Sequence, residues 1–198
     1  CTMIEFIDVS KTYPNGTNAL KHIDLKIEKG EFVSIVGPSG CGKTTVTELL
    51  ESRYGERAIH SYTTRSPRYE GESYHTFISE EEFSKLTGLV AYTKYNGFRY
   101  GTTEDQLDNA TLYVVDIPGV ETLLENYKNS ERPIRVFYLD STVKTRIRRM
   151  IDRHDSDTAI VGRLYNDEEY DWYHKLDHLV WHYKNNKQRN VELYKIDA

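Results

Sequence analysis

Residues 37–44 read Gly37-Pro38-Ser39-Gly40-Cys41-Gly42-Lys43-Thr44 and match the pattern G-x-x-x-x-G-K-[ST] in full. An apolar run, residues 32–36, precedes this stretch, and a segment of helical character, residues 44–52, follows it. A strand, a glycine-rich loop and a helix in this order form the phosphate-binding P-loop. Glycines let the loop backbone turn its N–H groups toward a phosphate. We therefore expect Lys43 to reach the β- and γ-phosphates of ATP and Thr44 to ligate Mg²⁺.

Composition narrows the class of protein. The chain has 198 residues, of which 38% are hydrophobic and 29% charged, as in a soluble globular protein with one medium domain or a core with an insert. No apolar run approaches the roughly 20 residues needed to span a bilayer, so we expect no membrane association. A net charge of −5 argues against nucleic-acid binding. Two cysteines give no disulfide framework, which indicates a reducing cytoplasm.

Arginine is nevertheless concentrated in two places in this acidic chain. Arg65 and Arg68 form the first cluster, and four arginines between residues 146 and 153 form the second. Guanidinium groups bind phosphate through two parallel hydrogen bonds, so such clusters suit small phosphorylated molecules. The alternative for the second cluster is a solvated helix face.

Strand and helix patterns alternate along the chain. The expected strands are residues 4–9, 19–27, 32–36, 57–61, 112–116, 134–139 and 177–183, with a hairpin of residues 89–94 and 98–100 around Asn96-Gly97. The expected helices are residues 44–52, 79–83, 141–153 and 167–176. This alternation predicts an α/β fold, a P-loop NTPase with a parallel sheet and flanking helices.

Several motifs in consistent order resemble the guanylate kinase family over about residues 32–183. Residues 61–68 read Ser-Tyr-Thr-Thr-Arg-Ser-Pro-Arg and match the segment by which that family binds its acceptor. Further matches are Tyr100-Gly101-Thr102, a strand ending in Asp116, and an arginine-rich lid at residues 149–164. The resemblance implies an acceptor-binding insert at about residues 61–103 and a lid at about residues 145–165, within a kinase domain of residues 31–198.

The resemblance also implies a role for individual residues. The residues that it assigns to the acceptor are Ser61, Arg65, Arg68, Tyr74, Tyr100, Thr102 and Asp116, with His75 as the alternative to Tyr74. The residues that it assigns to phosphoryl transfer are Lys43 and the lid arginines Arg149, Arg153 and Arg163.

Two departures from the family pattern concern the acceptor. The family places a guanine-reading Glu nine residues before the Tyr of Y-G-T, where this chain has Ala91. The family's D-I-D is also interrupted, because Pro118 follows Asp116-Ile117. A site selects a base through polar groups that the wrong base would leave unpaired, so Ala91 predicts relaxed base discrimination.

The N-terminal residues resemble a different family. Residues 3–45 are similar to the opening of an ABC-transporter ATPase, in which the aromatic residue at the position of Tyr13 stacks on adenine. No L-S-G-G-Q signature follows in this sequence. We therefore expect residues 3–30 to form an antiparallel β-layer of ABC type joined to the kinase body at the P-loop. The residues expected to bind ATP are Gly37, Pro38, Ser39, Gly40, Cys41, Gly42, Lys43, Thr44, Thr45 and Tyr13.

These patterns predict an ATP- and Mg²⁺-dependent nucleoside-monophosphate kinase of guanylate kinase type, with GMP or dGMP as the first expected acceptor and small-molecule nucleotides as its partners. Three alternatives stay open from the sequence. One is a non-catalytic binding module, which an intact P-loop disfavours. Another is a kinase for a different phosphorylated small molecule, which Ala91 permits. The third is an ABC-type ATPase component, which the absent signature motif disfavours. A GTPase is disfavoured in the same way, because residues 116–119 match D-x-x-G but no N-K-x-D guanine motif appears.

Overall fold

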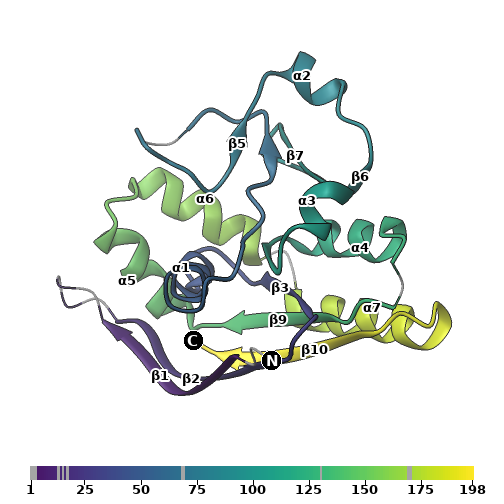
Figure 1. Cartoon of the computed structure of the whole chain (residues 1–198). Coiled ribbons are helices and arrows are strands. Elements are labelled where there is room, and N and C mark those ends of the chain that lie inside the picture. Colours follow the sequence, from purple (N-terminus) through teal and green to yellow (C-terminus); the bar gives the residue numbers. More distant parts are fainter. Residues whose placement is uncertain are drawn as a thin grey trace.

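A four-stranded parallel sheet forms the centre of the computed structural model, which describes residues 4–12, 14, 16, 18–67, 70–129, 131–168 and 171–198 (Figure 1). The strand order is β10-β9-β3-β8, and each neighbouring pair is parallel. The bounds of these strands are β3 Phe32–Val36, β8 Leu112–Val114, β9 Ile134–Asp140 and β10 Val191–Asp197. The predicted α/β fold with a parallel sheet is therefore confirmed.

Side-chain alternation along β3 gives the sheet two buried faces. Phe32 and Val36 belong to one hydrophobic cluster, whereas Val33 and Ile35 belong to another. Successive residues of a strand point to opposite faces, so one apolar strand can serve both clusters. The cluster around Phe32 is covered by α4 (Ile117–Asn126) and α7 (Trp172–Asn186).

The opposite face is covered by α1 (Lys43–Tyr54) and by an N-terminal hairpin of β1 (Ile4–Thr12) and β2 (Asn18–Ile27). The hairpin is antiparallel and lies beneath the central sheet in Figure 1, as the predicted β-layer requires. Its apolar residues Ile4, Ile23 and Leu25 pack in the same cluster as Val33 of β3 and Leu50 of α1. The hairpin therefore shares a hydrophobic core with the strand and helix that flank the P-loop.

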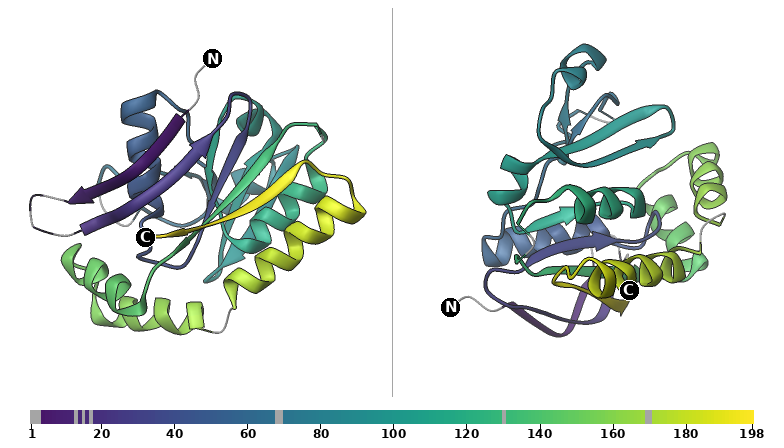
Figure 2. Two further views of the ribbon diagram at one scale, coloured as in Figure 1. Left: turned by 90° about the horizontal axis from the view of Figure 1, so that it is seen from below. Right: turned by 90° about the vertical axis from the view of Figure 1, so that its right-hand side faces the viewer.

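A second sheet stands above the first and corresponds to the expected acceptor insert (Figures 1 and 2). Its strand order is β5-β4-β7-β6, and β6 and β7 form the predicted hairpin with positive φ at Asn96 and Gly97. Ser79 caps the short helix α2 through a capping box with Glu82, as predicted. The bounds are β4 Tyr62–Thr63, β5 Thr76–Phe77, α2 Glu80–Ser84, β6 Leu89–Tyr95, β7 Phe98–Thr103 and α3 Glu104–Asp108.

Two helices, α5 (Val143–Asp152) and α6 (Asp157–Glu168), lie beside the P-loop in the segment expected to act as a lid, and we refer to them as the lid helices. They lie on one side of the central sheet, and the insert lies above it (Figure 1). None of the described helices is long and apolar enough to cross a membrane.

Three secondary-structure predictions were wrong. Residues 177–183 are helical within α7, because Leu176, Val180 and Tyr183 are buried at a spacing of four and three residues, a helical period. The expected helix 167–176 instead spans the end of α6 and the start of α7, where Asp171 caps α7. The expected strand 57–61 is reduced to a single bridge between Ala58 and Leu112.

Two of the expected site residues, Tyr13 and Arg68, lie outside the described residues.

Candidate functional site

The P-loop, the insert and the lid surround one cavity of about 1400 Å³. It lies at the carboxyl end of the P-loop strand β3, where ligands bind in open parallel sheets. Most of the predicted site residues in the described part of the chain line it. They are Ser39, Gly40, Gly42, Lys43, Thr44 and Thr45 from the P-loop and α1, Ser61, Arg65, Tyr74 and Tyr100 from the insert, and Arg149, Arg153 and Arg163 from the lid.

Two of the three P-loop glycines occupy positions where a side chain would not fit. Gly37 has φ of 154°, and a Cβ added there would lie 2.7 Å from the backbone oxygen of Leu139. Gly40 has φ of 80°, and its added Cβ would lie 2.9 Å from the backbone oxygen of Arg146. The loop is thus packed between β9 and α5, with its backbone at the cavity wall. This is a cradle of the kind that accepts phosphate groups.

Lys43, the first residue of α1, turns its side chain onto the loop. Its Nζ donates to the backbone oxygens of Gly37 at 2.6 Å and Pro38 at 3.0 Å. Thr44 and Thr45 follow in the first helical turn and line the cavity beside it. An ammonium group and a helix N-terminus at one place attract negative charge.

The insert brings a histidine to the expected acceptor residues. His75 Nδ1 lies 3.0 Å from Ser61 Oγ, and the His75 ring meets the Tyr100 ring edge-on with centroids 5.6 Å apart. Tyr74 instead turns to α1, where its hydroxyl donates to Glu48 Oε1. Of the two residues proposed from the sequence for one role, His75 is therefore the one beside Ser61 and Tyr100.

Arg65 forms a two-pronged ion pair with Glu72. Nη2 donates to Glu72 Oε1 at 2.7 Å, Nη1 donates to Oε2 at 3.1 Å, and both side chains are nearly buried. Burial lowers the pKa of Arg65, but the hydrogen bonds and charges of Glu72 and Tyr100 together raise it further than burial lowers it. The guanidinium is therefore held charged and oriented at the cavity wall.

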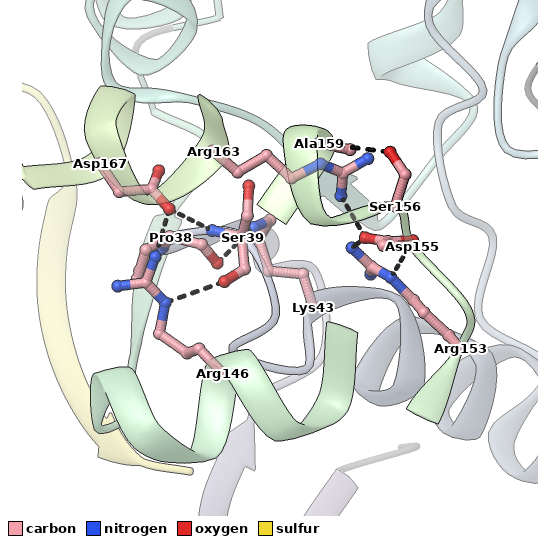
Figure 3. Close-up of polar contacts among 10 residues, drawn as sticks. All are labelled: Pro38, Ser39, Lys43, Arg146, Arg153, Asp155, Ser156, Ala159, Arg163 and Asp167. Atoms are coloured by element: carbon pink, nitrogen blue, oxygen red, sulfur yellow. Dashed lines mark hydrogen bonds and ion pairs between the residues drawn. The ribbon is translucent and has the colours of Figure 1, made fainter. Parts of the chain in front are cut away.

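The lid arginines have different partners. Arg149 Nη1 donates to the backbone oxygens of Cys41 at 3.1 Å and Gly40 at 3.3 Å, and burial lowers its pKa. Arg153 and Arg163 both pair with Asp155, with Arg153 Nε 2.9 Å from Oδ1 and Arg163 Nη1 3.3 Å from Oδ2 (Figure 3). All three arginines line the cavity that Lys43 also lines.

A few predicted site residues lie outside the cavity lining. Gly37, Pro38 and Cys41 are in the loop, where Cys41 is buried. Thr102 is buried in the insert sheet. Asp116 caps α4, because its Oδ1 accepts from Gly119 N at 2.9 Å, and its Oδ2 accepts from Thr93 Oγ1 at 2.9 Å.

Burial raises the pKa of Asp116, and its hydrogen bonds to Gly119 and Thr93 oppose that change.

The position expected to read guanine, Ala91, is fully buried in a hydrophobic cluster and does not line the cavity. A polar side chain at position 91 would lie in the hydrophobic core and not at the cavity wall, where it could contact a base.

Sequence reasoning missed the acidic partners of the basic residues. Glu72, Asp155 and Asp167 each bind an arginine of the site or lid. Single carboxylates at these positions match no motif, and only the folded chain shows which cation each one meets.

The residues present suit a nucleotide with a bound cation. Among the described residues no group of three or more His, Cys, Asp or Glu side chains could hold a metal by itself. A hydroxyl group in the first turn of a helix, next to a glycine-rich loop, can ligate Mg²⁺ together with the phosphates of a nucleotide. Few protein ligands are needed, because Mg²⁺ keeps several water ligands. Thr44 provides that hydroxyl at the cavity wall.

Comparisons with known proteins point to two families. The chain is 33% identical over 150 residues to the guanylate kinase of Synechocystis sp., covering 69% of this chain and 76% of that protein. The ABC transporter family model matches residues 20–136. The phosphonates import ATP-binding protein PhnC of Bacillus cereus is 51% identical over 71 residues, 36% of this chain. The chain spans only about a quarter (25%) of that protein's length.

Among solved structures, the guanylate kinase of Anaplasma phagocytophilum aligns with a TM-score of 0.46 and 20% identity, covering 76% of this chain and 80% of that one.

Proposed function

Because the chain belongs to the guanylate kinase family and, through residues 20–136, to the ABC transporter family, we propose that it transfers the γ-phosphoryl group of ATP to a nucleoside monophosphate. GMP or dGMP is the first acceptor to test. Small-molecule nucleotides would be its partners.

One observation supports this function most directly. A single cavity is lined by the P-loop lysine, by the insert residues Ser61 and Arg65, and by arginines of the lid. A phosphotransferase needs a donor phosphate and an acceptor phosphate side by side, with positive charge around both. An ATPase needs only the donor side, so the cations of the insert favour transfer to a second phosphorylated molecule.

The chemistry assigned to these residues is alignment and charge neutralisation. A phosphate oxygen of the acceptor attacks the γ-phosphorus of ATP, the bond from that phosphorus to the bridging oxygen breaks, and ADP leaves. Lys43 and the guanidinium groups of Arg149, Arg153 and Arg163 would neutralise charge on the transferred group. Mg²⁺, held with the help of Thr44, would supply further neutralisation at the donor phosphates. Arg65, already charged and oriented by Glu72, would bind the acceptor phosphate.

Discrimination among acceptor bases depends on the polar side chains that line the cavity. Ala91 supplies no polar group toward the cavity. The polar residues that line the cavity include Glu48, His60 and His75, and His75 lies beside Ser61. We infer weak discrimination among bases, with any preference set by these side chains.

A screen of acceptors tests the function. Release of ADP from MgATP would be measured with each nucleoside and deoxynucleoside monophosphate and with phosphorylated sugars, using the wild-type chain and Lys43→Ala. We expect at least one monophosphate to raise ADP release well above the rate without acceptor. Lys43→Ala should lower that rate by about a hundredfold or more, because a charge aimed at the transition state is lost.

Two results would reject the kinase. One is ADP release that no acceptor changes, which would indicate an ATPase. The other is the absence of turnover with measurable nucleotide binding, which would indicate a binding module. A folded Lys43→Ala protein with the wild-type rate would assign the activity to a contaminant.

A further inference from the structure

A buried ion pair next to the site joins the two lid helices. Arg146 on α5 and Asp167 on α6 pair through Arg146 Nη2 and Asp167 Oδ2 (Figure 3). Only 5% of Arg146 and 9% of Asp167 is exposed, and neither lines the cavity. Charged groups buried this deeply need well-placed partners, because an unpaired buried charge is strongly unfavourable.

Both side chains find their other partners in the P-loop, on the backbone of Ser39. Arg146 Nε donates to Ser39 O at 2.8 Å, and Ser39 N donates to Asp167 Oδ2 at 3.1 Å (Figure 3). Ser39 is the third residue of the P-loop pattern. Its two backbone hydrogen-bonding groups are therefore fixed by side chains 107 and 128 positions further along the chain.

The backbone of α5 touches the loop at the following residue. A Cβ on Gly40 would lie 2.9 Å from the Arg146 backbone oxygen and 3.2 Å from its Cα. Arg146 thus contacts the loop with its main chain at Gly40 and with its side chain at Ser39. This double contact restrains the position of the loop relative to α5, and the hydrogen bond from Ser39 N to Asp167 restrains it relative to α6.

We propose that Arg146 and Asp167 are positioning residues that hold the P-loop in the conformation that binds nucleotide phosphates. The inference rests on the proposed function, because it takes the P-loop as the nucleotide site. The pair acts through the Ser39 backbone and touches no substrate. A loop that is ordered before binding loses less conformational entropy when the ligand arrives, so it binds more tightly.

The test removes the pair while preserving the core. In the double variant Arg146→Met/Asp167→Leu both charges are replaced by apolar side chains, a change that proteins tolerate far better than loss of one partner. The matched control is Glu31→Leu/Arg135→Met. It removes the ion pair between Arg135 Nε and Glu31 Oε1, which lie 2.7 Å apart. The side chains of Glu31 and Arg135 are 9% and 14% exposed, and neither residue lines the cavity. Thermal unfolding and the Kd for MgADP and MgATP would be measured for all three proteins.

We expect the Arg146/Asp167 double variant to melt near the wild-type temperature but to bind both nucleotides at least about tenfold more weakly. The Glu31/Arg135 control should bind them as the wild type does, and the acceptor KM should change little in either. Wild-type affinity in a folded Arg146/Asp167 variant would overturn the proposal. Equal weakening in the control would also overturn it, because the effect would then be one of general stability.

A measurement on the wild-type chain covers the case in which that variant does not fold. The Ser39 amide proton should exchange slowly with solvent in the absence of nucleotide, because Asp167 accepts its hydrogen bond. Exchange as fast as that of an exposed loop amide would refute the restraint. If the wild-type chain binds neither MgADP nor MgATP, the proposed function fails, and the exchange of Ser39 still decides whether the pair orders the loop.

Discussion

At the scale of single residues, the site depends on cations that the fold has already paired. Arg65 is held by Glu72, Arg153 and Arg163 share Asp155, and Lys43 bonds to loop carbonyls. Pairing of this kind holds each group in a defined orientation. It also means that a phosphate must compete with an existing partner, so the effect of a substitution depends on that partner as well.

His75 provides the first prediction. We expect His75→Ala to raise the acceptor KM by roughly tenfold with little change in the KM for ATP, because His75 contacts Ser61 and Tyr100. Tyr74→Phe serves as the control, since the Tyr74 hydroxyl bonds to Glu48 on α1. Steady-state kinetics with each substrate varied in turn would measure both constants. A larger effect from Tyr74→Phe would reverse the assignment.

Asp116 provides a prediction about pH. Burial raises the folded-state pKa of this carboxyl, so its contribution to stability is present below the unfolded pKa and is lost as pH rises through the folded value. Asn caps helices as well as Asp does but carries no charge. Asp116→Asn should therefore gain stability relative to wild type as pH rises from 4 to 7.

Urea unfolding of wild type and Asp116→Asn at several pH values would show this gain. A variant that loses stability relative to wild type as pH rises would contradict the burial argument. If Asp116 also touches the metal or acceptor, kcat of the variant falls while its stability does not.

At the scale of elements, the sequence predicted what local patterns encode. The P-loop, the Asn96-Gly97 hairpin and the cap of α2 at Ser79 are confirmed because each depends on neighbouring residues. Residues 177–183 were mistaken for a strand because an apolar, aromatic run favours one locally. Their burial against α4 and the sheet follows a helical period, which only tertiary packing decides. The acidic partners of the site likewise come from elements distant in sequence.

The lid should respond to ligands unevenly along its length. Asp167, near the end of α6, accepts a hydrogen bond from Ser39 of the P-loop. In Figure 3, Arg153 and Arg163 instead pair with Asp155, which is partly buried. We expect hydrogen exchange of residues 145–165 to slow when a bisubstrate analogue binds, because the arginines then contact phosphates. Strand β10 serves as the internal reference. Unchanged exchange across residues 145–165 would show that these arginines do not close on the ligand.

The N-terminal hairpin should contribute to the stability of the whole domain. Ile23 of β2 is fully buried in the cluster that contains Val33 and Leu50. We expect Ile23→Ala to lower the free energy of unfolding by about 2–5 kcal/mol. Ile7 of β1 is 72% exposed, so Ile7→Ala should change it by less than about 0.5 kcal/mol. Equal effects in urea unfolding would mean that the hairpin is not packed on the sheet.

At the scale of the whole molecule, three parts far apart in sequence meet at one cavity. The P-loop would hold the donor, the insert the acceptor, and the lid the charge that moves between them. The chain matches two families, and its N-terminal hairpin lies beneath the central sheet while the insert stands above it (Figures 1 and 2). The P-loop, the insert and the lid line the cavity. We therefore propose that the chain transfers a phosphoryl group between two phosphorylated molecules.

Identification of the products tests that claim most directly. The wild-type chain would be incubated with MgATP and one monophosphate at a time, and all phosphorylated products would be separated and quantified by anion-exchange chromatography. Phosphoryl transfer predicts one new diphosphate in an amount equal to the ADP formed, or two ADP for each ATP consumed when AMP is the acceptor, with no inorganic phosphate. ADP accompanied by an equal amount of inorganic phosphate for every acceptor would contradict it.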